Sequence, residues 1–216
     1  MIRFDNELRE LNEAMTKMGS LCEEAIALSA SALISGKKEL AQEVEGLERE
    51  IDAMENDIES TCLQLLLRRQ PVARDLRQIS AALKLVTDME RIGDQAADIA
   101  EITASLDGHS ADDCAHVSEM ANAVIQMVNE SVDSFVQRDT NLAHEVIEHD
   151  DVVDALFEKV KAALIEMIVS DPGFGETALG LLMIAKYLER IGDHAVNIAE
   201  WVIFCITGLH HGVDAI

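Results

Sequence analysis

An internal repeat limits the folds open to this chain more than any other feature. The residues Glu-Arg-Ile-Gly-Asp occur at 90–94 and again at 189–193, inside the longer matching segments DMERIGDQAADIAE and YLERIGDHAVNIAE. Further matches lie upstream, at Glu48/Asp150, Asp52/Asp154 and Pro71/Pro172. A self-match of this length indicates a duplicated structural unit. We therefore predict two tandem units, residues 1–108 and 109–216.

The apolar residues of each unit are spaced as in long helices. Between residues 44 and 58 they recur every three or four positions, at Val44, Leu47, Ile51, Met54 and Ile58, which is typical of a helix with one buried face. Breaks in this pattern predict helices over residues 5–35, 38–69, 72–106, 112–137, 140–169 and 174–208. Aromatic residues make up only 3% of the chain and there are two prolines, which argues against sandwiches and barrels. The predicted fold class is all-α, with two tandem, similar three-helix bundles of long antiparallel helices.

Acidic residues recur at helical spacing inside the repeated segments. Glu90, Asp94, Asp98 and Glu101 lie within about 80° of one another around a helix, nearly opposite its apolar residues. Acidic pairs spaced by four residues also occur on the second helix of each unit. The candidate metal ligands are Glu48, Asp52, Glu90, Asp94 and Asp98 in the first unit and Asp150, Asp154, Glu189 and Asp193 in the second.

Two interpretations of these carboxylates stay open from the residues alone. One is a solvated acidic face, which is ordinary on the outside of a helix. The other is a cation site, because like charges four residues apart destabilise a helix and a bound cation would relieve that repulsion. Oxygen-only ligands suit hard cations such as Mg²⁺, Ca²⁺, Mn²⁺ or oxidised iron.

Other residues of the repeated segments carry weaker signals. Gly93 and Gly192 lie in mid-helix, where glycine is unfavourable, so we predict that another helix approaches closely there. His194 has Gln95 as its counterpart and is interpreted as an incidental polar residue. The four cysteines form no Cys-x-x-Cys pair and are expected to be buried thiols in a reducing compartment.

The charge of the chain restricts its partners. Seventeen Lys and Arg residues against 41 Asp and Glu give a formal net charge of −24. This balance argues against binding to nucleic acid and against adsorption to an anionic membrane. The N-terminus is charged and lacks an apolar signal segment, and no stretch is long enough for a membrane span. We expect a cytoplasmic protein.

The doubled Glu-Arg-Ile-Gly-Asp segment, the paired carboxylates and the opening RFDNELRELNEAMTKMGSLCEEAI together resemble the PhoU family of phosphate-transport regulators. The resemblance covers essentially the whole chain. It implies an elongated all-α homodimer, and in some members multinuclear clusters of iron or zinc on the acidic motifs. Its motif positions here are the nine candidate ligands named above. Asn197 replaces the acid found at Asp98, which puts a second cluster of equal strength in doubt.

The resemblance also implies a function. A PhoU-like protein is a negative regulator of the phosphate-starvation response and of phosphate transport, and an adaptor between the phosphate transporter ATPase and a sensor histidine kinase. The alternatives are a metal- or phosphate-storage or structural helical protein, and a carboxylate-bridged metalloenzyme. No Glu-x-x-His pair repeats in this chain, although di-iron bundle enzymes use such pairs. We predict a protein that is not an enzyme.

Overall fold

The computed structural model describes residues 2–37, 39–69, 71, 73–106 and 115–209. The regular structure in these ranges is helical throughout: α1 (Ile2–Ser35), α2 (Glu39–Arg69), α3 (Ala73–Ser105), α4 (Ala115–Gln137), α5 (Thr140–Ser170), the short 3-10 helix η2 (Pro172–Phe174) and α6 (Gly175–Thr207). The six predicted helices are confirmed, with ends that differ by at most three residues. Residues 112–114 of the predicted fourth helix lie outside the described ranges.

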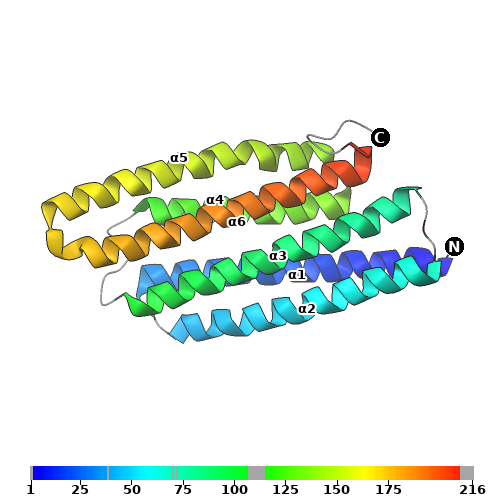
Figure 1. Cartoon of the computed structure of the whole chain (residues 1–216), viewed down its shortest axis with the longest axis horizontal. Helices are drawn as coiled ribbons and strands as arrows, with labels where there is room; N and C mark the ends of the chain where they lie inside the picture. The colour runs from blue at the N-terminus through cyan, green and yellow to red at the C-terminus, as the bar shows by residue number, and fades with distance from the viewer. Residues whose placement is uncertain (1, 38, 70, 72, 107–114, 210–216) are drawn as a thin grey trace.

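The helices form two antiparallel three-helix bundles that lie side by side along the long axis of the molecule (Figure 1). Among the described residues, α2 contacts only α1 and α3, and α5 contacts only α4, α6 and η2. Between the bundles α3 packs against α6, and α1 packs against α4. The helices α2 and α5 therefore lie at the outer edges, and each presents one long face to solvent.

One apolar core runs through both bundles. Its members include the stripe predicted on α3, where Met89, Ile92 and Ala96 are fully buried and Ile99 is 1% exposed. The matching stripe on α6 is buried as well, at Leu188, Ile191, Ala195 and Ile198. Burial of these stripes turns the opposite faces of α3 and α6, with their acidic residues, away from the core.

Aspartates and a glycine cap helices at the boundaries predicted from breaks in the apolar pattern. Asp139 caps α5 by accepting bonds from the backbone N–H groups of Asn141 and Leu142. Asp171 caps η2, whose first residue is Pro172. Gly208 follows α6 in the left-handed conformation, with φ of 78°, and donates its N–H to the Phe204 carbonyl. Such caps satisfy backbone groups that a helix end leaves unpaired.

The close approach predicted at the mid-helix glycines is present in one repeat. A Cβ atom at Gly93 would lie 3.0 Å from Cδ1 of Ile51 on α2, closer than side chains normally pack. At Gly192 the nearest atom, Oδ1 of Asp150 on α5, would lie at an ordinary 3.5 Å. The contact between α2 and α3 is thus the one that leaves little room for a side chain at the mid-helix glycine.

Candidate metal centre

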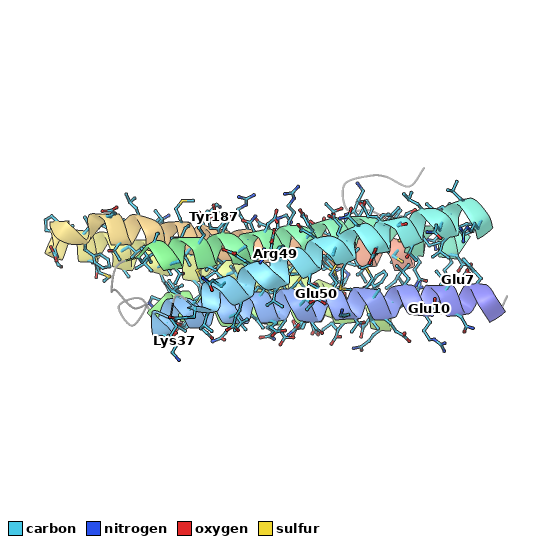
Figure 2. All side chains as sticks on the ribbon, turned by 90° about the horizontal axis from the view of Figure 1, so that it is seen from below. Glu7, Glu10, Lys37, Arg49, Glu50 and Tyr187 are labelled. Atoms are coloured by element: carbon cyan, nitrogen blue, oxygen red, sulfur yellow. The ribbon has the colours of Figure 1, made fainter. Side chains whose placement is uncertain are left out.

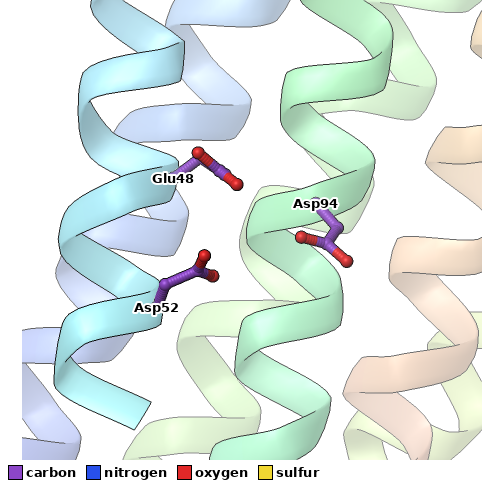
Figure 3. Close-up of side chains that lie close together, drawn as sticks. All are labelled: Glu48, Asp52 and Asp94. Atoms are coloured by element: carbon purple, nitrogen blue, oxygen red, sulfur yellow. The ribbon is translucent and has the colours of Figure 1, made fainter. Parts of the chain in front are cut away.

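Three carboxylates of the first repeat converge between α2 and α3. Glu48 and Asp52 project from α2, and Asp94 projects towards them from α3 (Figure 3). One oxygen of each carboxylate lies within 4.8 Å of an oxygen of each of the other two, and all three side chains are partly buried. This trio, Glu48, Asp52 and Asp94, is called the first cluster below.

The contact at Gly93 brings these carboxylates together. Ile51 of α2 lies against Gly93 of α3, and the next residue of each helix is acidic: Asp52 and Asp94. Glu48 stands one turn before Asp52, on the same face of α2. The apolar contact therefore holds the two helices close enough for carboxylates from both to meet at the rim of the bundle.

Glu48 is the member of the first cluster whose charge is disfavoured. Partial burial raises the pKa of Glu48, and the charges of Asp52 and Asp94 raise it further. Oδ1 of Asp52 is buried, and it accepts no hydrogen bond from any residue that the structure describes. A buried acceptor without a partner is costly. Three carboxylate oxygens this close together are a ligand set that fits a hard cation.

The acidic surface extends one turn further on both helices. Partial burial raises the pKa of Glu90 on α3, as does the neighbouring charge of Asp94. Arg91 makes ion-pair contacts with both, 3.3 Å from Nε to Oε2 of Glu90 and 3.1 Å from Nη1 to Oδ2 of Asp94. Because the Arg91 side chain is half exposed, it neutralises these carboxylates from the solvent side only.

Glu55 is a further carboxylate on the acidic face of α2 that lies outside the nine predicted candidates. Burial raises the pKa of this carboxyl, and the charges of Glu59 and Asp52 contribute in the same direction. Glu55 stands three residues after Asp52, so its spacing already placed it on the acidic face of the helix. The internal repeat gives no signal for Glu55, because the second repeat has Phe157, not an acid, at the corresponding position.

The second repeat has a similar group, Asp150 and Asp154 on α5 with Glu189 and Asp193 on α6, called the second cluster below. Burial raises the pKa of Asp150 to about 6, with further contributions from the charges of Asp154 and Asp193. Burial and the Glu189 charge raise the pKa of Asp193, and the Lys186 charge opposes that shift. Lys186 hydrogen-bonds Oε2 of Glu189.

The structure places Asp98 outside the first cluster. Asp98 lies beside Tyr187 of α6 and, after burial, is the main cause of the raised pKa of that phenol. Asn197, its counterpart, donates a hydrogen bond to Asp88 of α3. Both positions thus belong to the contact between α3 and α6. The replacement of an acid by Asn197 is therefore no measure of how strongly the second cluster could hold a metal.

His194 is part of the same contact. Its Nδ1 lies 2.9 Å from Oδ1 of Asp88, and both side chains are mostly buried. His194 is therefore a contact residue between the repeats and not incidental to the fold, whereas the interpretation that it is no essential ligand stays a prediction. It joins the two repeats, because α6 packs against α3 at this point.

Fold and site define a class of protein: a duplicated three-helix bundle with a carboxylate cluster between the second and third helices of each repeat. The chain belongs to the PhoU family, whose domain model matches residues 15–103 and 117–202. The two matched segments fall one in each predicted unit. The resemblance stated from the sequence motifs is thereby confirmed.

Individual relatives agree along most of their length. The chain is 36% identical to the phosphate-specific transport system accessory protein PhoU homologue of Clostridium acetobutylicum, covering 95% of this chain and 94% of the relative. It is 40% identical to that of Aquifex aeolicus, covering 88% and 86%. The crystal structure of PhoU from Pseudomonas aeruginosa superposes with a TM-score of 0.90 at 36% identity, covering 95% of this chain and 100% of that one.

A second solved structure extends the comparison. The phosphate transport system regulatory protein PhoU from Streptococcus pneumoniae gives a TM-score of 0.87 at 26% identity, over 98% of this chain and 99% of that chain. The all-α fold of two similar three-helix bundles is therefore shared with solved members of the family. Within the described residues, no helix is both long and apolar enough to cross a membrane.

Proposed function

We propose that this protein is a non-enzymatic negative regulator of phosphate-specific transport and of the phosphate-starvation response. One observation carries the proposal. Both repeats and nearly the whole length match proteins named as accessory or regulatory components of phosphate-specific transport. In this role the protein is a cytoplasmic adaptor between the transporter ATPase and a sensor histidine kinase, and acts as a homodimer.

The shape and charge of the molecule suit an adaptor. The outer helices α2 and α5 are each 31 residues long, and acidic side chains such as Glu7 and Glu10 on α1 and Glu50 on α2 lie along the molecule (Figure 2). A net charge of −24 favours basic partner surfaces and accelerates encounter at low salt. Binding to either partner should therefore weaken as the salt concentration rises.

The proposal includes a metal at the first cluster. Glu48, Asp52 and Asp94 would supply its oxygen ligands, and the cation would give a partner to Oδ1 of Asp52, which is buried without a hydrogen bond from any described residue. The family resemblance suggests iron or zinc, whereas the oxygen ligands also suit Mg²⁺, Ca²⁺ or Mn²⁺. The bound cation would offset carboxylate repulsion and tie α2 to α3.

Deletion in the native host tests the regulatory role. In phosphate-rich medium, loss of the gene should raise a phosphate-starvation promoter reporter, and a plasmid copy should silence it again. Complementing the deletion strain with the Asp52→Asn/Asp94→Asn variant shows whether silencing of the reporter requires the metal ligands. A silent reporter in a deletion strain that lacks paralogues would contradict the proposal.

A storage protein is the second candidate, and the convergence of Glu48, Asp52 and Asp94 is the observation that favours it. A store predicts that metal content changes with supply while the reporter stays silent after deletion. A regulator predicts that the reporter rises. Measuring both in one strain distinguishes the two functions.

A further inference from the structure

The two carboxylate clusters are not equivalent, although their residues stand at matching positions of the two repeats. Three neighbouring positions differ between the repeats. Glu55, Glu59 and Thr87 of the first repeat are replaced in the second repeat by Phe157, Lys161 and Lys186, respectively. Each difference makes the second repeat less acidic or more basic.

These replacements change the charge around the two clusters. Over the eight matched positions, the first repeat has six carboxylates and one arginine: Glu48, Asp52, Glu55, Glu59, Glu90, Asp94 and Arg91. The second repeat has four carboxylates, two lysines and one arginine: Asp150, Asp154, Glu189, Asp193, Lys161, Lys186 and Arg190. Net formal charge is thus −5 in the first repeat and −1 in the second.

Lys186 lies beside one carboxylate of the second cluster. Its Nζ hydrogen-bonds Oε2 of Glu189, one turn along α6; the Glu189 side chain is 17% exposed and that of Lys186 is 47% exposed. Nζ also lies 5.6 Å from the centre of the Phe157 ring, within the range of a cation–π interaction. The Phe157 ring lies close to the ammonium groups of both Lys186 and Lys161, and it has no oxygen with which to ligate a metal. The corresponding residue of the first repeat, Glu55, carries a carboxylate that could ligate one.

The carboxylates of the second cluster also fail to converge. Among the described residues, Glu48, Asp52 and Asp94 are the group of carboxylates that meets the geometry of a cation site; Asp150, Asp154 and Asp193 do not meet it. The ammonium group of Lys186 already supplies a positive charge there. A divalent ion would have to displace it or tolerate its repulsion.

We propose that Lys186 is the built-in cation of the second cluster, and that it excludes a metal ion there, so that metal binding is confined to the first cluster. The inference rests on the metal part of the proposed function. It also makes the duplicated sites unequal: the first repeat depends on a bound ion, and the second carries its own counterion.

Titration with Mn²⁺ alone, followed by electron paramagnetic resonance and calorimetry, tests the exclusion. The wild-type chain should bind Mn²⁺ at one cluster. Asp52→Asn/Asp94→Asn should abolish that binding, whereas Asp150→Asn/Asp193→Asn should leave it unchanged. A fall in bound Mn²⁺ after the second pair of substitutions would overturn the proposal.

Exchanging the matched residues gives the sharper test. Phe157→Glu/Lys161→Glu/Lys186→Thr gives the second repeat the residues of the first at all three differing positions, and should about double the number of Mn²⁺ ions bound. Thr87→Lys makes the reverse change at an exposed position, and should weaken binding at the first cluster at least tenfold. Unchanged binding in a folded Thr87→Lys variant would overturn the proposal even if the triple variant failed to fold.

A metal-free arm separates this inference from the proposed function. In the presence of EDTA, Lys186→Met should lower the melting temperature by about 1–2 °C. The matched control Lys159→Met removes an exposed lysine of α5 and should leave it unchanged. If the wild-type chain binds no Mn²⁺, the metal part of the proposed function fails, and this arm alone decides whether Lys186 is the counterion. Equal melting temperatures for the two variants would refute that role.

Discussion

Asn197 on α6 donates a hydrogen bond of 3.2 Å to Oδ1 of Asp88 on α3. In the alignment of the repeats Asn197 corresponds to Asp98 and Asp88 to Tyr187, and Asp98 and Tyr187 also lie together. The same pair of positions thus meets twice, once in each direction across the contact between α3 and α6. The two repeats are therefore related by an approximate two-fold axis that passes between these helices.

Removing Asp88 should weaken the contact between the repeats. Asp88→Ala deletes the acceptor of the exposed Asn197 and the partner of His194, in a pair whose side chains are both mostly buried. We expect the free energy of unfolding to fall by about 1–2 kcal/mol, measured by urea denaturation. Glu43→Ala, at an exposed position of α2, is the control and should change stability by less than about 0.5 kcal/mol. Equal effects would show that the polar contact adds nothing.

Neutralising Asp52 should have opposite effects with and without metal. In EDTA, Asp52→Asn relieves repulsion with Glu48 and Asp94 and should stabilise the chain by about 0.5 kcal/mol. With Mn²⁺ present, the variant should lose the metal-induced rise in melting temperature that the wild-type chain shows. Asp57→Asn, at an exposed site one turn further along α2, is the matched control and should retain that rise. If Asp52→Asn were less stable than the wild-type chain in EDTA, repulsion between Asp52 and its neighbouring carboxylates would be ruled out.

The metal-free protein should become more stable as pH falls from 7.5 to 5. The pKa of Asp150 is raised to about 6 by burial and by Asp154 and Asp193. The folded state therefore binds this proton more tightly than the unfolded chain, and stability is lost as pH rises through 6.

Asp150→Asn isolates this contribution. The variant should be more stable than the wild-type chain at pH 7.5 by about 1 kcal/mol, after allowance for partial solvent exposure, and should vary less between pH 5 and 7.5. Thermal melts in EDTA across this range provide the measurement. A wild-type chain whose stability rises with pH across the window would contradict the raised pKa.

Alanine at the two mid-helix glycines should separate close packing from helix propensity. Gly192→Ala meets only ordinary contacts at 3.5 Å and beyond, so it should stabilise the chain by about 0.5–1 kcal/mol. Gly93→Ala meets Ile51 at 3.0 Å, so it should stabilise the chain less or destabilise it. Its free energy of unfolding should be at least about 1 kcal/mol lower than that of Gly192→Ala.

The consequence of Gly93→Ala for the first cluster follows from the same contact. Moving α2 away from α3 separates Asp52 from Asp94, so Mn²⁺ affinity should fall, as measured by calorimetry. Gly192→Ala should leave that affinity unchanged. Identical stability and Mn²⁺ binding in the two variants would show that the contact at Ile51 is not close enough to matter.

Much of the fold could be predicted from the sequence because it depends on local periodicity. The spacing of Met89, Ile92, Ala96 and Ile99 identifies a helix and its buried face without any knowledge of its neighbours. The duplicated segment similarly predicts two like units. Asp52 and Asp94 could be named as candidates because both lie off the buried face and recur in the second repeat.

The division of the acidic face could not be read from the sequence. Asp94 and Asp98 are only about 40° apart around α3, yet Asp94 meets α2 and Asp98 meets α6. Which helix covers which side depends on how the two bundles pack against each other, and α6 begins 70 residues after α3 ends. The role of Lys186 is equally non-local, because it depends on the contact of α6 with Phe157 of α5. The sequence by itself determined the repeat, the helices and their buried faces, through the 3.6-residue period of the backbone. Only the tertiary structure decided which carboxylates share a site, because that depends on packing between helices whose relative positions no local pattern encodes.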